Sequence, residues 1–228
     1  MPTKRKQPPA VIAAAFANPV DQQLVTGFLA GLGYQPVAFS ADRAPKADLF
    51  ILDAPSARRF GEPVLERKRA TEIFLPAIIA LGQEAPVDPW LAAGFDDSLR
   101  LPFTKAELAR RVEILLRVRR QSQALAQSAE ARYRALFENA PVGIGVADQQ
   151  GRLLLFNQAM LASGGYTPED IEQMESVADL YHDPQQRQAA LEKFRAEGRL
   201  MDFRVQFKRK DGTPYDALLS LTPITFQG

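Results

Sequence analysis

The sequence predicts an α/β domain with a doubly wound parallel sheet, followed by a smaller α+β domain with an antiparallel sheet, joined by one long helix. In residues 10–118, short runs that are apolar at every position alternate with helical segments, which is typical of parallel strands covered on both faces. In residues 130–228, strand-like runs alternate apolar and polar positions, which is typical of antiparallel strands with one solvent-exposed face. Residues 103–140, between them, contain neither glycine nor proline.

The glycine- and proline-free stretch predicts a single connecting helix over residues 104–138, because it consists mainly of strong helix-forming residues. Thr104 and Glu107 have the spacing of a capping box at its start. Apolar positions are dense in Leu108–Leu116, sparse in the middle, and dense again in Tyr133–Phe137. A helix that is apolar at both ends indicates a connector shared by two folded domains.

Composition excludes several classes of function. The net charge of +1 indicates no dedicated nucleic-acid or membrane partner, and no apolar run approaches the ~20 residues of a membrane span. The absence of cysteine excludes disulfides, thiol catalysis, cysteine-ligated metals and cysteine-adduct flavin photochemistry. A single histidine, His182, excludes a histidine-rich metal site, and we do not assign it as a haem ligand because it precedes a helix cap. We expect a cytoplasmic protein without a catalytic site in these residues.

The N-terminus has two interpretations. Residues 1–9 form a basic tail, and the apolar run that follows at residues 11–17 imitates a secretory signal. The run is short and follows two prolines, and it fits a buried first strand. We therefore predict a strand.

Five strands are expected in the first domain: Val11–Ala15, Tyr34–Phe39, Asp48–Leu52, Ala77–Leu81 and Ser98–Arg100. Pro36 predicts that the second strand lies at a sheet edge. Residues 40–46 are too few and too rich in proline and alanine for a normal helix, so we predict that the helix between the second and third strands is missing or reduced to a turn. Residues 55–69 are interpreted as a loop followed by a basic helix.

Four segments of this domain, in their order and spacing, resemble a bacterial response-regulator receiver domain: Gly31–Tyr34, Asp48–Asp53, Gly94–Asp97 and Leu101–Phe103. The resemblance implies a flavodoxin-like fold and places Asp53 at the position of the phosphoacceptor. It also implies a dimerisation surface on the face built from the fourth and fifth helices and the fifth strand of that family's fold.

At the positions that support phosphorylation in that family, this sequence has residues that lack the required functional groups. By this resemblance, Phe16 and Ala17 stand where carboxylates would hold Mg²⁺, Gly82 where a hydroxyl would contact the phosphoryl group, and Leu101 where a lysine would neutralise it. Two roles remain open for Asp53: a relic that caps the following segment, or a working phosphoacceptor. We favour the relic, which makes residues 10–118 a pseudo-receiver domain.

The second domain resembles a PAS domain in four segments: Arg134–Ile144, Gly151–Asn157, Gly165–Asp170 and Arg209–Tyr215. The resemblance implies one antiparallel sheet of five strands packed against helices, often around a small ligand. The sequence provides four strands, so residues 130–228 are interpreted as a PAS domain that lacks its last strand.

A ligand pocket and a filled core are both compatible with the apolar residues of this domain. The candidate pocket consists of Ile144, Phe194, Phe203, Val205, Phe207, Tyr215 and Leu219. We favour a filled core, predict no cofactor or metal, and leave open a small ligand of unknown identity.

Together these observations predict a regulatory module of bacterial signal transduction. A non-phosphorylated receiver-like domain would be coupled through the helix to a PAS domain, as the N-terminal part of a cyclic-di-GMP enzyme or a sensor histidine kinase. We expect a homodimer through the connecting helix and the PAS domain, with other signalling proteins as partners. The alternative is a response regulator that is phosphorylated on Asp53 and uses PAS as its effector.

Overall fold

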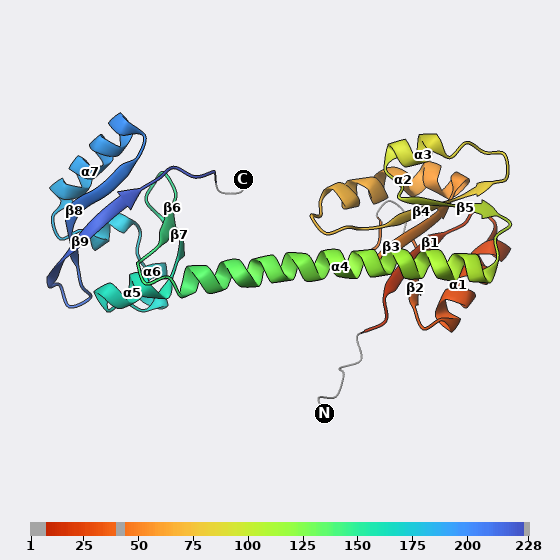
Figure 1. The fold of residues 1–228 in the computed structure, drawn as a ribbon, viewed down its shortest axis with the longest axis horizontal. Helices are drawn as coiled ribbons and strands as arrows, with labels where there is room; N and C mark the ends of the chain where they lie inside the picture. Colours follow the sequence, from red (N-terminus) through yellow and green to blue (C-terminus); the bar gives the residue numbers. More distant parts are fainter. Residues whose placement is uncertain (1–7, 40–43, 226–228) are drawn as a thin grey trace, which may run out of the picture. The chain divides into compact units, whose positions relative to one another are not determined.

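The computed structural model describes residues 8–39 and 44–225, and the chain divides into two compact units, residues 1–129 and 130–228 (Figure 1). Within the described residues, none of the helices combines the length and apolarity that a membrane crossing requires.

The first unit is built on a five-stranded, fully parallel sheet with the strand order β2-β1-β3-β4-β5. The strands are β1 (Val11–Ala15), β2 (Gln35–Val37), β3 (Leu49–Asp53), β4 (Ala77–Gly82) and β5 (Asp97–Leu101). The helices are α1 (Pro19–Gly31), α2 (Ala54–Arg69), α3 (Asp88–Ala93) and the first part of α4 (Lys105–Glu138). This strand order is that of flavodoxin-like folds, so the predicted doubly wound receiver-like architecture is confirmed.

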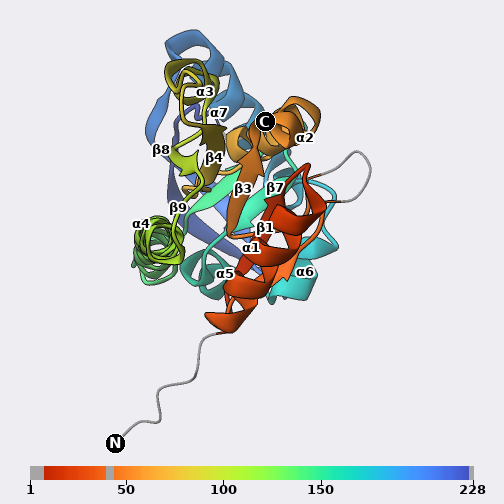
Figure 2. The same ribbon diagram turned by 90° about the vertical axis from the view of Figure 1, so that its right-hand side faces the viewer.

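Both faces of this sheet are buried, as the continuous apolar runs predict. Alternate residues of β1, β3 and β4 pack with α1 and α4 on one face, and the intervening residues pack with α2 and α3 on the other (Figure 2). The run read as either a signal segment or a strand is β1, which pairs with β2 and β3. β2 pairs only with β1, so Pro36 lies on an edge strand.

The segments that follow β2 and β3 test two predictions about helices. Among the described residues, no helix lies between β2 and β3, and residues 40–43 of the segment in which the helix was expected to be lost lie outside the described residues. The loop expected at the start of residues 55–69 is wrong, because α2 begins at Ala54, directly after β3. The reason is local: Asp53 caps the helix and Pro55 occupies its first turn, where a missing N–H costs nothing.

Helix α4 is held by the first unit further along its length than its apolar residues indicate. Thr104 caps it, with the N–H of Glu107 donating to Oγ1 at 3.1 Å. Beyond the buried Leu108–Leu116 segment, Arg119 donates through Nη1 to the carbonyl of Phe74 at 2.8 Å. The N–H of Phe74 donates to Oγ of Ser122 at 3.0 Å. The anchored part of the helix therefore extends to Ser122, past the predicted domain limit at residue 118.

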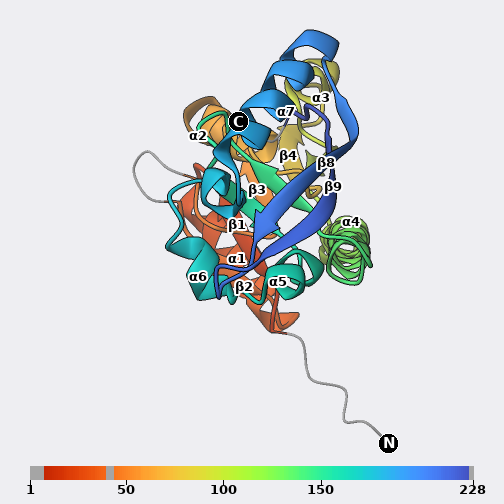
Figure 3. The same cartoon turned by 90° about the vertical axis from the view of Figure 1, so that its left-hand side faces the viewer.

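The second unit contains β6 (Gly145–Ala147), β7 (Leu153–Phe156), α5 (Gln158–Gly164), α6 (Pro168–Glu172), a 3₁₀ helix (Val177–Leu180), α7 (Pro184–Glu197), β8 (Leu200–Lys208) and β9 (Pro214–Leu221). β6 pairs with β7 and β8 pairs with β9, both antiparallel, and α7 packs along β8 (Figure 3). The expectation of a single antiparallel sheet is met only in part, because the two strand pairs are not hydrogen-bonded to each other. Among the described residues, no strand bridges the two pairs.

Candidate functional site

Asp53 lies at the carboxyl end of β3, the edge of a parallel sheet at which ligands usually bind. Its side chain is buried and both of its oxygens are engaged. Oδ1 accepts from the N–H of Ser56 at 2.9 Å, and Oδ2 accepts from the N–H of Ala17 at 2.8 Å. The carboxylate therefore caps α2 and ties the end of β3 to the segment after β1.

The other predicted positions gather at the same edge. Phe16 and Ala17 follow β1, Gly82 ends β4, and Leu101 ends β5 opposite Gly82. Phe16 is buried, and its ring packs edge-on against Phe103, with the ring centroids 6.4 Å apart. The sheet thus places beside Asp53 four positions that have neither a charge nor a side-chain oxygen.

Gln22, on α1, is a residue of this edge that the sequence interpretation missed. Its Oε1 accepts from the N–H of Phe16 at 2.7 Å, and its Nε2 donates to the carbonyl of Ala14 at 3.1 Å. The backbone N–H groups of Phe16 and Ala17 are therefore both occupied by side chains.

This geometry has a chemical consequence. A divalent cation such as Mg²⁺ needs several oxygen ligands, and phosphoryl transfer needs cationic stabilisation of the transferring group. Asp53 is the single carboxylate among the five compared positions, and nowhere in the described residues do three or more acidic or histidine side chains form a cluster that could hold a metal ion. The arrangement supports helix capping better than it supports phosphorylation.

In the second unit, Asn157 is a buried polar residue with a full set of partners, and none of its surface is exposed. Its Oδ1 accepts from the N–H groups of Ile144 at 2.9 Å and Met160 at 3.1 Å. Its Nδ2 donates to the carbonyls of Phe137 at 2.9 Å and Val142 at 3.0 Å. One amide group thus joins the last turn of α4, the segment leading into β6 and the start of α5.

The candidate pocket residues are only partly brought together. Phe203 pairs with Leu219 and Phe207 with Tyr215 across β8 and β9, and Val205 is almost fully buried. Ile144 and Phe194 come from other elements, the segment before β6 and α7, and Ile144 is 36% exposed.

Packing around Phe207 favours the filled-core interpretation. Phe207 packs against the buried cluster of Leu161, Ile171 and Leu180, and its ring centroid lies 4.9 Å from that of Tyr181. Burial raises the pKa of both the Tyr181 and Tyr215 phenols, so both stay neutral at physiological pH. Whether a small ligand enters this face of β8 and β9 stays a prediction.

Comparison with known proteins now adds to this geometry. Residues 141–228 match a protein-family model described as "PAS domain". This segment is a PAS domain. Its β-hairpin of β8 and β9, its short helices and its buried Asn157 all lie inside the matched range. No curated protein matches the sequence at a significant level.

Solved structures similar to the chain include both kinds of domain. One is the receiver domain of a sensor histidine kinase from Pseudomonas aeruginosa PAO1, crystallised with a magnesium ion in its active-site cleft. It is 27% identical, covers 47% of this chain and 98% of its own, and has a TM-score of 0.39. Another is the PAS domain of an HTR-like protein from Haloarcula marismortui, which is 26% identical over 48% of this chain and 91% of its own, with a TM-score of 0.42. A combination of receiver-like and PAS domains is typical of bacterial signalling proteins.

Proposed function

We propose that the chain is a regulatory module in which a non-phosphorylated pseudo-receiver is coupled through α4 to a PAS sensory or dimerisation domain. The observation that carries this proposal is the state of Asp53, whose two oxygens cap α2 and hold the N–H of Ala17. Such a carboxylate lacks both the metal ligands and the cation that phosphorylation requires. The first unit then acts through its surface and through the helix that leaves it.

The module would work in the cytoplasm as part of a larger signalling protein. We propose a cyclic-di-GMP enzyme or a sensor histidine kinase as the output, because the resemblance of residues 130–228 to a PAS domain implies an output of this kind. No catalytic role falls to the chain itself in this proposal. A change in either unit would be passed on as a shift of a paired α4 helix between two arrangements.

A second copy of the chain is the proposed partner of α4. Ile114, Val118 and Leu125 are exposed by 45%, 41% and 73%, and their spacings of four and seven residues place them on one face of the helix. Exposed apolar side chains at coiled-coil spacing favour pairing with an identical helix.

Replacing Leu125 with glutamate should weaken dimerisation about tenfold or more, because it puts two like charges into an apolar seam. Sedimentation equilibrium of the 228-residue chain measures the change. Gln127→Glu is the matched control, because residue 127 lies on roughly the opposite side of the helix at about 100° per residue and should leave the dimer unchanged. A wild-type chain that is monomeric, or equal weakening by both variants, would contradict pairing through this face.

A further inference from the structure

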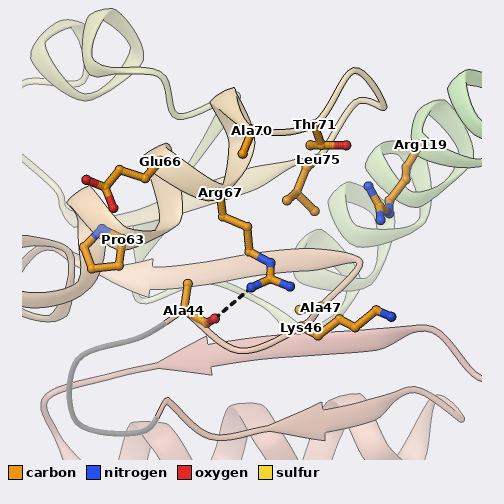
Figure 4. A pocket seen from close by; sticks show the side chains of 10 residues that line it. All are labelled: Ala44, Lys46, Ala47, Pro63, Glu66, Arg67, Ala70, Thr71, Leu75 and Arg119. Atoms are coloured by element: carbon orange, nitrogen blue, oxygen red, sulfur yellow. Dashed lines mark hydrogen bonds between the residues drawn. The ribbon is translucent and has the colours of Figure 1, made fainter. Parts of the chain in front are cut away.

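A hollow lies in the first unit at the amino-terminal edge of the sheet, which is the edge opposite to Asp53. It has a volume of about 580 Å³, which is within the usual range for small-molecule sites (Figure 4). It is bordered by the segment before β3, the end of α2, the segment before β4 and the side of α4; the lining residues are Ala44, Lys46, Ala47, Pro63, Glu66, Arg67, Ala70, Thr71, Leu75 and Arg119. The buried Ala47 and Leu75 give it an apolar floor.

The charged side chains that line this hollow are mainly cationic. Lys46, Arg67 and Arg119 stand against a single acidic residue, Glu66. Arg67 reaches into the hollow and donates through Nη1 to the carbonyl of Ala44 at 3.2 Å (Figure 4). Within the described parts of the chain, the other guanidinium N–H groups of Arg67 and the ammonium of Lys46 have no hydrogen-bond partner.

The two cationic residues that follow Arg67 in the sequence, Lys68 and Arg69, both have acidic partners. Lys68 and Arg69 share the last turn of α2 with Arg67, where positive charge is favoured by the helix dipole. Lys68 forms an ion pair with Asp96 and donates to the carbonyl of Gly94 at 2.6 Å, and Arg69 pairs with Glu62 at 2.9 Å. Arg67 differs from both, because no acidic group among the described residues pairs with it.

Arg119 connects the hollow to the anchor of α4. Its Nε donates to Oδ1 of Asp48 at 3.1 Å, and its Nη1 donates to the carbonyl of Phe74. The side chain is only 13% exposed. An anion in the hollow that approaches this guanidinium competes with Asp48 for it.

We propose that the hollow binds a small organic anion, whose carboxylate or phosphate group is held by Arg67 and Lys46 and approached by Arg119. The planar fork of a guanidinium group can donate two parallel hydrogen bonds to a carboxylate or to a phosphate, and the apolar floor accommodates the remainder of the molecule. Binding draws Arg119 from Asp48 and loosens the turn of α4 that ends at Ser122. The site is an input independent of Asp53, and its ligand binding does not depend on the proposed signal relay.

Isothermal titration calorimetry of the 228-residue chain tests the site, with inorganic pyrophosphate and citrate as separate probes. We expect a dissociation constant below about 1 mM for one probe or both, and about tenfold weaker binding in Arg67→Gln and in Lys46→Gln. Binding of pyrophosphate alone would assign a phosphate-bearing ligand, and binding of citrate alone a polycarboxylate.

Arg69→Gln is the matched control, since this residue lies two positions from Arg67 on α2, does not line the hollow and should leave affinity unchanged. Lys46 is exposed, so its substitution does not threaten folding, which a thermal melt verifies. Absence of binding to both probes, undiminished binding in the Arg67 and Lys46 variants, or equal loss in Arg69→Gln would overturn the proposal.

Hydrogen exchange tests the connection to α4. The N–H of Phe74, which donates to Ser122, should exchange about threefold faster or more when the anion is bound, because that anchor is loosened. Binding that leaves this exchange unchanged, or slows it, would overturn the part assigned to Arg119.

Discussion

Asn157→Ala should lower the unfolding free energy of the second unit by about 3 kcal/mol, the largest effect expected of a single substitution in this chain. The change removes four hydrogen bonds and leaves the N–H groups of Ile144 and Met160 and the carbonyls of Phe137 and Val142 without that partner. Asn157 is itself fully buried, so the substitution also removes closely packed side-chain atoms. The last turn of α4 loses its side-chain link to the PAS sheet at the same time.

Urea unfolding followed by two probes separates the units. The only tryptophan, Trp90, lies on α3 of the first unit, so its fluorescence reports that unit, whereas far-UV circular dichroism reports both. We expect the dichroism transition of the second unit to move to lower urea while the Trp90 transition stays in place.

Asn139→Ala is the control for this experiment. Its side chain is exposed and makes one hydrogen bond, to the carbonyl of Ala135 at 2.8 Å, so the cost should stay below about 0.5 kcal/mol. Equal destabilisation by the two variants would contradict the role assigned to the buried amide of Asn157.

Asp53→Ala should lower the unfolding free energy of the first unit by about 2 kcal/mol, because α2 loses its cap and the N–H of Ala17 loses its acceptor. Asp53→Asn should also destabilise, because the N–H groups of Ser56 and Ala17 are accepted by different oxygens and asparagine would turn its NH₂ group toward one of them. Urea unfolding followed by Trp90 fluorescence measures the unfolding free energy of the first unit in both variants.

Asn18→Ala, which removes the exposed cap of α1, is the control and should cost about 1 kcal/mol or less. A catalytic carboxylate held in an unfavourable environment behaves in the opposite way, because its removal commonly stabilises the fold. Variants of Asp53 that are as stable as the wild-type chain, or more stable, would therefore contradict the capping role.

Local patterns in the sequence predict the elements of this structure well. Residues close in the chain account for the five parallel strands, the edge position of Pro36 and the lack of a helix among the described residues between β2 and β3. The start of α2 was misjudged although its signal was present: an aspartate followed two residues later by proline is a helix start with proline in the first turn. The predicted capping role of Asp53 is compatible with this start, but a loop was expected where the helix begins.

Contacts between distant residues explain what the sequence did not predict. Asn157 caps α5, which is a local role, but its bonds to Phe137 and Val142 depend on how α4 and β6 meet. The cationic hollow combines residues from Ala44 to Arg119, which no short motif connects. The anchor at Ser122 was missed because a hydroxyl group adds nothing to an apolar stripe.

The first unit should not be phosphorylated on Asp53, and intact-mass analysis after incubation with acetyl phosphate and Mg²⁺ tests this. Wild-type chain and Asp53→Ala are treated in parallel, beside a receiver domain that retains its acidic residues as the positive control. We predict that the positive control gains a phosphoryl group and that the wild-type chain keeps its mass, because Asp53 caps α2 next to Phe16 and Ala17. A stoichiometric mass gain in the wild-type chain that disappears in Asp53→Ala would contradict the claim and establish a phosphorylated response regulator instead.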